Sequence, residues 1–432
     1  MTSEVAIMNR RCVVLAADSA QTVTYTINGK EEKRYFKGEN KIIQLSEHRP
    51  VGLMTFGNAN LERVPWELLI KLFRTELGKK SFNDIQGYAN ELFTFIDAHN
   101  DLFPAGDRQA ALKRHISTAA YSILKQAMTS PGYTGAKEVR EQAVAINDFV
   151  DTASAAYENN QLAPPFNQVE VAQVLATTSG DVANELKAVF PAEDPWGSIN
   201  FQSLSIAAIK LLYREYERLL DDNSTGIVIA GYGDKDFFPK LSEYRCFGLL
   251  GARSLWKEAR RQQAVTVERS AHLLGFASTR MIETIENGFS LSAFDIFVEA
   301  SRKSLRGYSE SIKNELKLSS LPNEDAHITQ ATELFRKASV SANLDRNYWP
   351  LLRVIEALPV DEMIELGETL IKLESLKEKV TEPTESVSGA VDVAVISKTD
   401  GFIWIKRKHY FDPQMNPRYF ARLNRAAHGD VK

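Results

Sequence analysis

The pattern of apolar and polar residues changes character several times along the chain. Short apolar runs rich in β-branched residues, typical of buried strands, occur near the start, in the middle and near the end. Between them, apolar residues recur at spacings of three and four, which predicts helices. The resulting order of strands, helices, strands, helices and strands predicts an α+β protein with mainly antiparallel sheets.

Two of the connections between the predicted strands carry residues typical of hairpin turns. A polar stretch over 21–40 predicts an extended hairpin with its turn at Asn28-Gly29, and Asp400-Gly401 predicts the turn of a closing hairpin. The predicted strands cover residues 5–8, 12–17, 42–45, 51–56, 226–231, 244–250, 271–276, 391–396 and 402–405.

The helical segments suggest additions to one domain. Residues 103–200 are rich in Ala, Gln, Asn and Thr and are interrupted by prolines, which favours an accessory helical insertion. We therefore expect a single domain over 1–432, with helical insertions at 103–200 and 290–358 and a basic C-terminal tail at 406–432. The other predicted helices cover residues 61–77, 84–96, 203–220, 281–286, 293–316 and 361–379.

Composition narrows the class of protein. Of the 432 residues, 44% are hydrophobic and 25% are charged, as in soluble globular proteins, and the net charge of -4 disfavours nucleic acid as a partner. No apolar run approaches the roughly 18 residues of a membrane span, and the first residues lack the pattern of a signal peptide. Cys12 and Cys246 are too few for a disulfide framework, and the histidines lack metal-ligand spacing. We expect a cytoplasmic protein with no metal, cofactor or membrane partner.

The first two residues carry candidate chemistry. Methionine aminopeptidase removes an initiator methionine when a small residue follows, so the opening Met1-Thr2 predicts a mature chain that begins at Thr2. Thr2 would then hold a hydroxyl and a free α-amine, whose pKa of roughly 7.7–8.0 suits it to accept the hydroxyl proton. One residue can thus be nucleophile and base together.

Two further segments complete a charged trio around Thr2. The strand that ends in Ala16-Ala17-Asp18-Ser19 places Asp18 sixteen positions after Thr2, and Lys41 opens the next predicted strand pair. A buried lysine near the hydroxyl would favour the alkoxide, and Asp18 would neutralise and orient that lysine. Lys37 and Lys33 are alternatives to Lys41, but no apolar strand follows either.

This opening resembles that of proteasome β-type subunits and of HslV-like N-terminal nucleophile (Ntn) hydrolases. The family pattern is a terminal threonine, a strand, a turn and a strand that ends in such an aspartate; HslV and the Anbu proteins also begin Met-Thr. The resemblance covers roughly residues 2–100, 200–290 and 359–405. It implies Thr2, Asp18 and Lys41 as catalytic residues.

The same resemblance implies supporting residues that match less well. The segment Val51 to Ala59 resembles a strand and turn that supply a backbone oxyanion donor at Phe56-Gly57, although Phe56 stands where the family has glycine. Glu385 and Ser388 match by spacing an acid and a serine before the closing hairpin. Ser278 is the hydroxyl nearest to the position of a serine that assists the amine.

The resemblance implies a four-layer αββα sandwich of two antiparallel sheets and a threonine peptidase that needs no cofactor. The implied partners are peptide or protein substrates, further copies in a homo-oligomeric ring, and an ATPase (unfoldase) or regulatory protein. Two alternatives stay open at this point. One is a small-molecule amidase on the same fold, and the other is a catalytically inactive, ring-forming structural or regulatory subunit.

Overall fold

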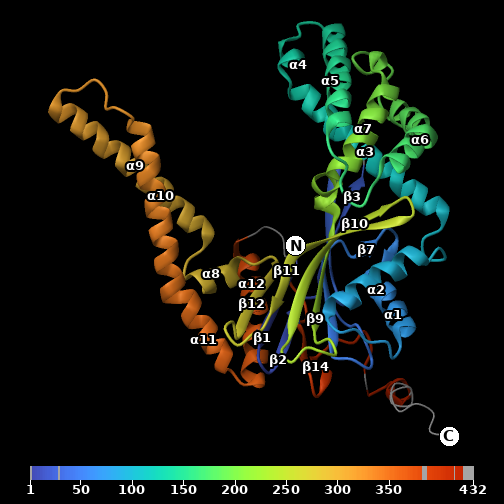
Figure 1. The fold of residues 1–432 in the computed structure, drawn as a ribbon, viewed down its shortest axis with the longest axis vertical. Helices are drawn as coiled ribbons and strands as arrows, with labels where there is room; N and C mark the ends of the chain where they lie inside the picture. The colour runs from blue at the N-terminus through green and yellow to red at the C-terminus, as the bar shows by residue number, and fades with distance from the viewer. Residues whose placement is uncertain (1, 28–29, 382–386, 413, 422–432) are drawn as a thin grey trace.

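The computed structural model describes residues 2–27, 30–381, 387–412 and 414–421, and it is a mixed α/β molecule with antiparallel sheets (Figure 1). The predicted α+β class is therefore confirmed. The predicted turn Asn28-Gly29 lies outside the described residues, although the strands that flank it, β3 (Ala20–Ile27) and β4 (Lys30–Lys37), pair as expected. In the described part of the chain, no helix combines the length and apolar character of a bilayer span.

The first large sheet joins the start of the chain to its end. Its strand order is β12-β1-β2-β13-β14, and each described pairing is antiparallel. In this register Glu4 of β1 lies opposite Phe276 on one side and Ala17 on the other. The strands are β12 (Ala271–Ala277), β1 (Ser3–Asn9), β2 (Cys12–Ala17), β13 (Asp392–Ser397) and β14 (Gly401–Lys406).

The second large sheet contains a strand that the sequence pattern does not predict. Its order is β11-β10-β9-β6-β5, again antiparallel. The unpredicted strand is β11, which runs at the edge of the sheet and carries Lys, Glu, Arg and Gln; polar residues of this kind are tolerated at an edge and hide the strand pattern. The strands are β11 (Arg253–Ala264), β10 (Lys240–Leu250), β9 (Thr225–Gly231), β6 (Val51–Gly57) and β5 (Ile42–Gln44).

The two sheets pack face to face, and side-chain alternation along β1 explains how. Ala6 and Met8 enter the core between the sheets, where they meet Met54 and Val228 of the second sheet. Val5, Ile7 and their neighbours on β2 face the opposite way, toward helices. The residues at positions 2 and 4 share the face of Ala6 and Met8, so they belong to the space between the sheets.

Helices cover the outer face of each sheet. Helices α11 (Trp349–Ala357) and α12 (Val360–Thr381) bury apolar side chains against the first sheet, and α1 (Trp66–Leu77) and α2 (Ile85–Ala98) against the second. Helix α1 begins five residues later than predicted. The preceding residues form the small hairpin of β7 (Asn60–Leu61) and β8 (Val64–Pro65), and proline is favoured at a helix start rather than within it.

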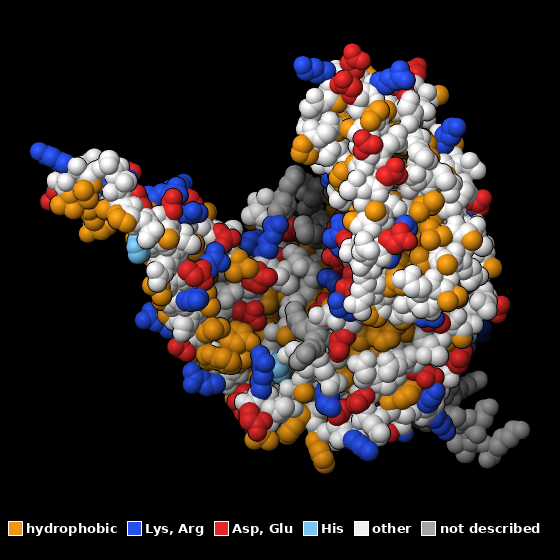
Figure 2. All heavy atoms as spheres, turned by 45° about the horizontal axis from the view of Figure 1, so that its top comes forward, with side chains coloured by type: hydrophobic (Ala, Val, Ile, Leu, Met, Phe, Trp, Pro, Cys, Tyr) orange, Lys and Arg blue, Asp and Glu red, His pale blue; other side chains and the backbone are white. Residues whose placement is uncertain are grey.

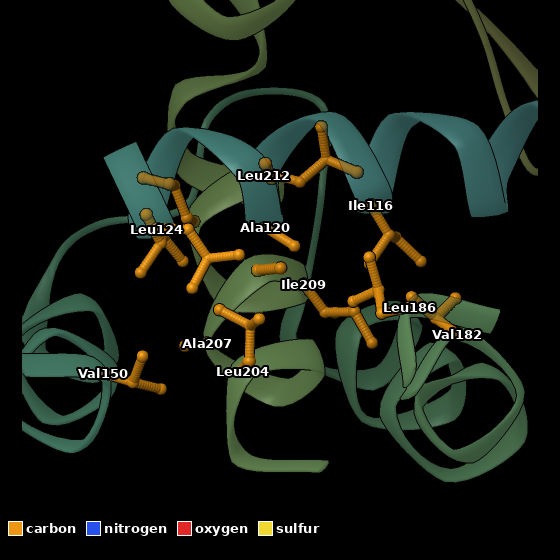
Figure 3. Packing of buried hydrophobic residues seen from close by; sticks show 14 of the residues in the cluster. Ile116, Ala120, Leu124, Val150, Val182, Leu186, Leu204, Ala207, Ile209 and Leu212 are labelled. Atoms are coloured by element: carbon orange, nitrogen blue, oxygen red, sulfur yellow. The ribbon is translucent and has the colours of Figure 1, made fainter. Parts of the chain in front are cut away.

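The helical segment after α2 forms a separate cluster. Helix α7 runs through its centre, and Leu204, Ile209 and Leu212 of α7 pack against apolar residues of α3, α5 and α6 (Figure 3). The structure confirms that this segment is helical, whereas its status as an insertion stays a prediction. The helices are α3 (Ala105–Thr129), α4 (Pro131–Gly135), α5 (Val139–Asn159), α6 (Gln168–Val189) and α7 (Phe201–Leu220), with short 3-10 turns at Trp196–Ser198 and Asp221–Asn223.

A second group of helices forms an arm that extends away from the sheets (Figure 1). It consists of α8 (Arg280–Asn287), α9 (Leu291–Leu316) and α10 (Glu324–Asn343), followed by a π-helical turn at Leu344–Tyr348. Few of its side chains are buried, and Ile296, Phe297 and Leu334 are largely exposed. Figure 2 shows hydrophobic side chains gathered along this arm. The start of the tail after β14 is held by Lys408, which pairs with buried Asp392.

Candidate functional site

Thr2 lies directly before β1, at the end of the space between the sheets. Its side chain is only 8% exposed. The Thr2 carbonyl accepts a hydrogen bond of 2.8 Å from the Ser278 amide, and the next residue, Ser3, donates its amide to Asp18 Oδ1 at 3.0 Å and its hydroxyl to the Ser278 carbonyl. The backbone at Thr2 is therefore fixed from two sides.

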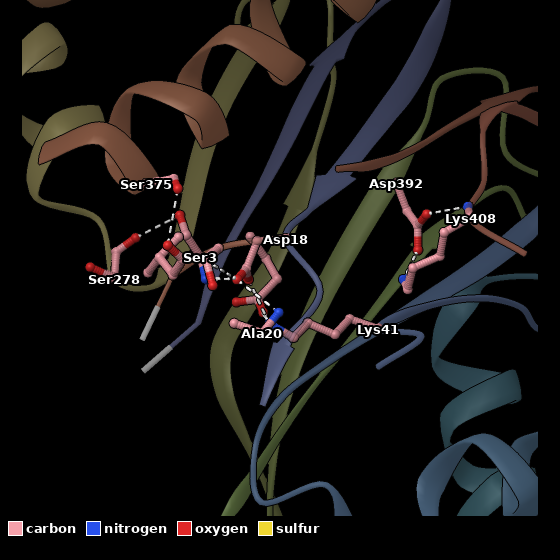
Figure 4. A network of polar contacts seen from close by, with 11 residues as sticks. Ser3, Asp18, Ala20, Lys41, Ser278, Ser375, Asp392 and Lys408 are labelled. Atoms are coloured by element: carbon pink, nitrogen blue, oxygen red, sulfur yellow. Dashed lines mark hydrogen bonds and ion pairs between the residues drawn. The ribbon is translucent and has the colours of Figure 1, made fainter. Parts of the chain in front are cut away.

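Asp18 follows β2 and is 1% exposed (Figure 4). Its Oδ1 accepts from the Ser3 amide and from Lys41 Nζ, while its Oδ2 accepts from the amides of Ala20 and Ser388. One carboxylate thus joins the start of β1, the end of β2, the start of β5 and the segment before β13. The sequence predicted Asp18 near Thr2 and Lys41, and the structure brings these residues together.

Lys41 comes directly before β5, and its carbonyl accepts from the Thr55 amide of β6. The side chain is 1% exposed, with Nζ 2.5 Å from Asp18 Oδ1 and 3.5 Å from Glu4 Oε1. A buried ammonium needs such partners because its desolvation is costly. Lys37, an alternative from the sequence, is exposed on β4, so the structure favours Lys41.

Glu4 is a buried carboxyl that sequence reasoning missed. It is 0% exposed, on the same face of the chain as Thr2. Burial raises the pKa of Glu4 to about 8; the Lys41 ammonium opposes the shift, the Asp18 carboxylate adds to it, and the nearby Thr2 hydroxyl lowers the pKa slightly. No hydrogen bond of regular distance and angle reaches either Glu4 oxygen from the described residues. The available signal was a single acidic residue inside a strand that is otherwise largely apolar.

Phe56, which stands where the family has glycine, is buried in the core rather than exposed in an open cleft. Its ring is 6% exposed, lies between the sheets over Gly226, and contacts Phe276 with ring centroids 5.8 Å apart. Gly57 ends β6 with φ of +84°, and a Cβ there would meet the Ser224 carbonyl oxygen at 2.6 Å, so glycine is needed at this position. The turn is therefore shaped by packing, and its role as an oxyanion donor stays a prediction.

Ser278 reaches Thr2 through its backbone rather than its hydroxyl. The hydroxyl donates to Glu374 Oε1 at 2.7 Å, while the Met281 amide donates to Glu374 Oε2 at 2.7 Å. Glu374 is 1% exposed and lies on the buried face of α12, three positions after Ile371. Sequence reasoning missed this residue too, although helical periodicity placed it on the apolar face.

The two residues expected before the closing hairpin have different outcomes. Glu385 lies outside the described residues. Ser388 is buried, and its amide donates to Asp18 Oδ2 at 3.0 Å while its carbonyl accepts from the Ser19 amide at 3.3 Å. The Ser388 hydroxyl makes no hydrogen bond with the described residues. Ser388 therefore holds Asp18 in place through its backbone.

The arrangement combines a hydroxyl, a cation and two carboxyls in one buried space. Lys41 can balance one negative charge, and that charge is already supplied by Asp18, which lies 2.5 Å from Nζ. Three backbone amides also donate to Asp18. A second buried carboxylate would be undercompensated, which is the physical reason that burial raises the pKa of Glu4 to about 8. Such a site can exchange a proton with the Thr2 hydroxyl and support negative charge on its oxygen.

Comparison with known proteins gives a distant likeness of fold. No family model matches the chain, and no curated protein matches it. Among solved structures, it is similar to Anbu (ancestral β-subunit) from Yersinia bercovieri at 9% identity and a TM-score of 0.26, over 100% of this chain and 98% of the other. It is also similar to an Anbu (Gly-1) mutant from Hyphomicrobium sp. strain MC1 at 10% identity and a TM-score of 0.23, with the same coverage.

These findings correct the family assignment made from the sequence. Membership of the proteasome β-type or HslV-like family, with a large helical insertion, is wrong as stated, because no family model or curated relative matches and the structural likeness is only a distant fold relation. The physical reason lies in what the motifs encode. Short segments at strand ends can position a charged trio without the rest of a family's sequence.

Proposed function

We propose that this protein hydrolyses amide bonds in peptides, with the Thr2 hydroxyl as nucleophile after cleavage of the bond that precedes Thr2. The observation that carries the proposal is the buried Lys41–Asp18 ion pair, which lies beside a buried threonine at the start of β1, an interior strand of the first sheet. Burying two charges is costly, and structural stability alone seldom favours it over apolar packing.

The architecture supports the same function. We interpret the stacked sheets, with helices on both outer faces, as a four-layer αββα sandwich of the Ntn-hydrolase type. In such an arrangement Thr2 would stand at the start of β1, between the two sheets. The Ser278 amide holds the carbonyl of Thr2, and the Ser3 amide is held by Asp18, so the nucleophile is fixed without using its own hydroxyl.

The mechanism follows from these contacts. The Thr2 oxygen attacks the amide carbonyl, and the Lys41 ammonium favours negative charge in this part of the site. The amine leaves to give an ester on Thr2, and water then hydrolyses that ester. A free α-amine, produced when the preceding bond is cleaved, has a pKa of roughly 7.7–8.0 and can take part in proton transfer.

Two measurements test the proposal. Intact-mass analysis of the purified protein should show that the chain begins at Thr2. A panel of fluorogenic peptide amides should be cleaved by the wild type, and Thr2→Ala should lower kcat/KM by at least 100-fold while leaving the thermal midpoint within a few degrees. A retained residue before Thr2 together with unchanged cleavage by Thr2→Ala would contradict the proposal. Cleavage confined to small amides in the same panel would point to an amidase instead.

A further inference from the structure

Thr2 and Glu4 are two residues apart on an extended chain, so their side chains project from the same face. That face is turned toward the second sheet, as Ala6 and Met8 show. Glu4 therefore projects into the space in which the Thr2 hydroxyl also lies, and both residues are more than nine-tenths buried. The neighbouring strands leave room for the carboxyl because the residue opposite Glu4 on β2 is the small Ala17.

The groups around Glu4 leave its carboxyl available for proton exchange. Phe276 lies opposite it on β12, with the Phe56 ring against Phe276, so this side is apolar. The charged groups that face it are Lys41, with Nζ 3.5 Å from Oε1, and Asp18 behind Lys41. Neither Glu4 oxygen accepts a regular hydrogen bond from the described residues, in contrast to Asp18, whose oxygens accept four.

We propose that Glu4 is the general base of this site and accepts the proton of the Thr2 hydroxyl during attack. The proposal rests on the proposed role of Thr2 as nucleophile and adds the group that activates it. Asp18 is less suited to be the general base, because its oxygens already accept hydrogen bonds from Lys41 and three backbone amides. Lys41 carries a positive charge beside two acids and has no lone pair to offer.

The proton returns at each step, so the cycle balances. As the Thr2 oxygen bonds to the amide carbon, the hydroxyl proton moves to the Glu4 carboxylate and the carbonyl electron pair moves to oxygen. When the carbon–nitrogen bond breaks, Glu4 gives this proton to the leaving amine. In deacylation Glu4 takes a proton from water as the hydroxide adds to the ester, and returns it to the Thr2 oxygen as that bond breaks.

The ionisation of Glu4 suits this task. Burial raises its pKa to about 8, so its carboxyl exchanges protons close to neutral pH. A catalytic base is most effective when its pKa lies near the working pH, and a positioned base contributes roughly 10²–10⁴-fold to a rate. Glu4→Gln keeps the size of the side chain and removes its ability to accept the proton.

The test uses a hydrophobic β-lactone as a probe, because ring opening by the Thr2 oxygen adds the mass of the whole lactone. Acylation of the full chain is followed by intact mass at pH 8.5, above the pKa of about 8 of Glu4, over a range of lactone concentrations. For Glu4→Gln we expect the maximal acylation rate to fall at least 100-fold, the half-saturating concentration to stay within threefold, and the melting temperature not to fall. A purely structural role would instead change the half-saturating concentration or the melting temperature.

Glu39→Gln is the matched control. Glu39 is another carboxyl whose pKa is raised mainly by burial and is influenced by Lys41 and Asp18, but its position is on the loop before Lys41 rather than beside Thr2. Its acylation rate should stay within threefold of wild type. If Glu4→Gln does not fold, Glu4→Asp decides the question, with an expected rate loss of at least tenfold.

Each remaining outcome points to one of the two proposals. A folded Glu4→Gln, or a folded Glu4→Asp where Glu4→Gln fails, that reacts within threefold of wild type overturns the role of Glu4 and leaves Thr2 as nucleophile with its α-amine as base. If Thr2→Ala is acylated as fast as wild type, and digestion places the modification in the same N-terminal peptide, the role of Thr2 itself is overturned.

Discussion

Lys41 is the residue on which the electrostatics of the site depend. It is the cation that both Asp18 and Glu4 contact, and all three side chains are almost fully buried. Removing one partner of a buried ion pair leaves an uncompensated charge, which typically costs 3–5 kcal/mol. Lys41 therefore links the stability of the site to its chemistry.

We expect Lys41→Met to lower the free energy of unfolding by about 3–5 kcal/mol and to abolish acylation of Thr2. Denaturant unfolding followed by circular dichroism measures the first effect, and intact mass with the β-lactone measures the second. Lys37→Met, at an exposed position on β4, is the control and should change stability by less than about 1 kcal/mol. Equal effects of the two substitutions would show that the buried Lys41–Asp18 pair contributes no more to stability and acylation than an exposed lysine does.

Glu4 makes stability depend on pH in a defined direction. Its pKa is about 8 in the folded chain, against a usual value of 4.5, so between these values the folded state holds a proton that the unfolded state has released. The contribution of Glu4 to stability is full below pH 4.5 and is lost as pH rises through 8. The free energy of unfolding of wild type should therefore fall with pH more steeply than that of Glu4→Gln, by up to about 1.4 kcal/mol per pH unit.

Denaturant unfolding of both proteins at intervals from pH 5 to 9 measures this difference in slope. Parallel curves for wild type and Glu4→Gln would mean that Glu4 ionises in the folded protein much as it does in the unfolded chain.

At the scale of elements, helix α12 connects one helical layer to the candidate nucleophile. Glu374 of α12 accepts from the Ser278 hydroxyl and the Met281 amide, and the Ser278 amide in turn holds the Thr2 carbonyl. The carboxylate thereby fixes the segment between β12 and α8. Its effect on Thr2 is indirect, which makes Glu374 a positioning residue.

Glu374→Ala should leave a buried hydroxyl and a buried amide without their acceptor, at a cost of roughly 2–4 kcal/mol in the free energy of unfolding. We expect a higher half-saturating lactone concentration and a lower maximal rate of Thr2 acylation, because the hydrogen-bonded anchor of the Thr2 backbone is loosened. Glu365→Ala, at an exposed position on the same helix, is the matched control. An acylation rate for Glu374→Ala equal to that of the control would argue against this connection.

Strand prediction succeeded where burial is uniform and failed at β11, an edge strand that is rich in charged residues. Strands β1, β2, β6 and β9 are almost wholly buried, so their apolar runs stand out in the sequence. Strand β11 pairs with β10 on one side only, and its polar residues follow from its edge position. The edge strands β12 and β14 keep apolar runs and were predicted, so the charged residues of β11 rather than its edge position alone hid it.

At the scale of the whole molecule, the helical cluster and the arm differ in how they are packed. The cluster of α3–α7 has a continuous apolar core, whereas the described residues of α9 and α10 bury few side chains. Local stability follows buried apolar contacts. The two helical regions should therefore open at different rates even though both are regular helices.

Hydrogen exchange followed by mass spectrometry should show fast exchange over α9 and α10 and slow exchange over α3 and α7. Helix α12, which packs on the first sheet, serves as an internal reference for slow exchange. If hydrogen exchange of the purified protein shows α9 and α10 to be as protected as α12, another surface must cover the arm in solution.

Local patterns in the sequence determined the strands around the site, the helical character of the regions at 103–200 and 290–358, and the candidacy of Thr2, Asp18 and Lys41. These features depend on periodicity and on spacing within short segments, which the chain encodes directly. Only the tertiary structure decided that Lys41 rather than Lys37 is buried, that Glu4 shares its space, and that Glu374 anchors Ser278. Burial and charge compensation arise from residues far apart in the chain, so they exist only once the sheets and helices have packed.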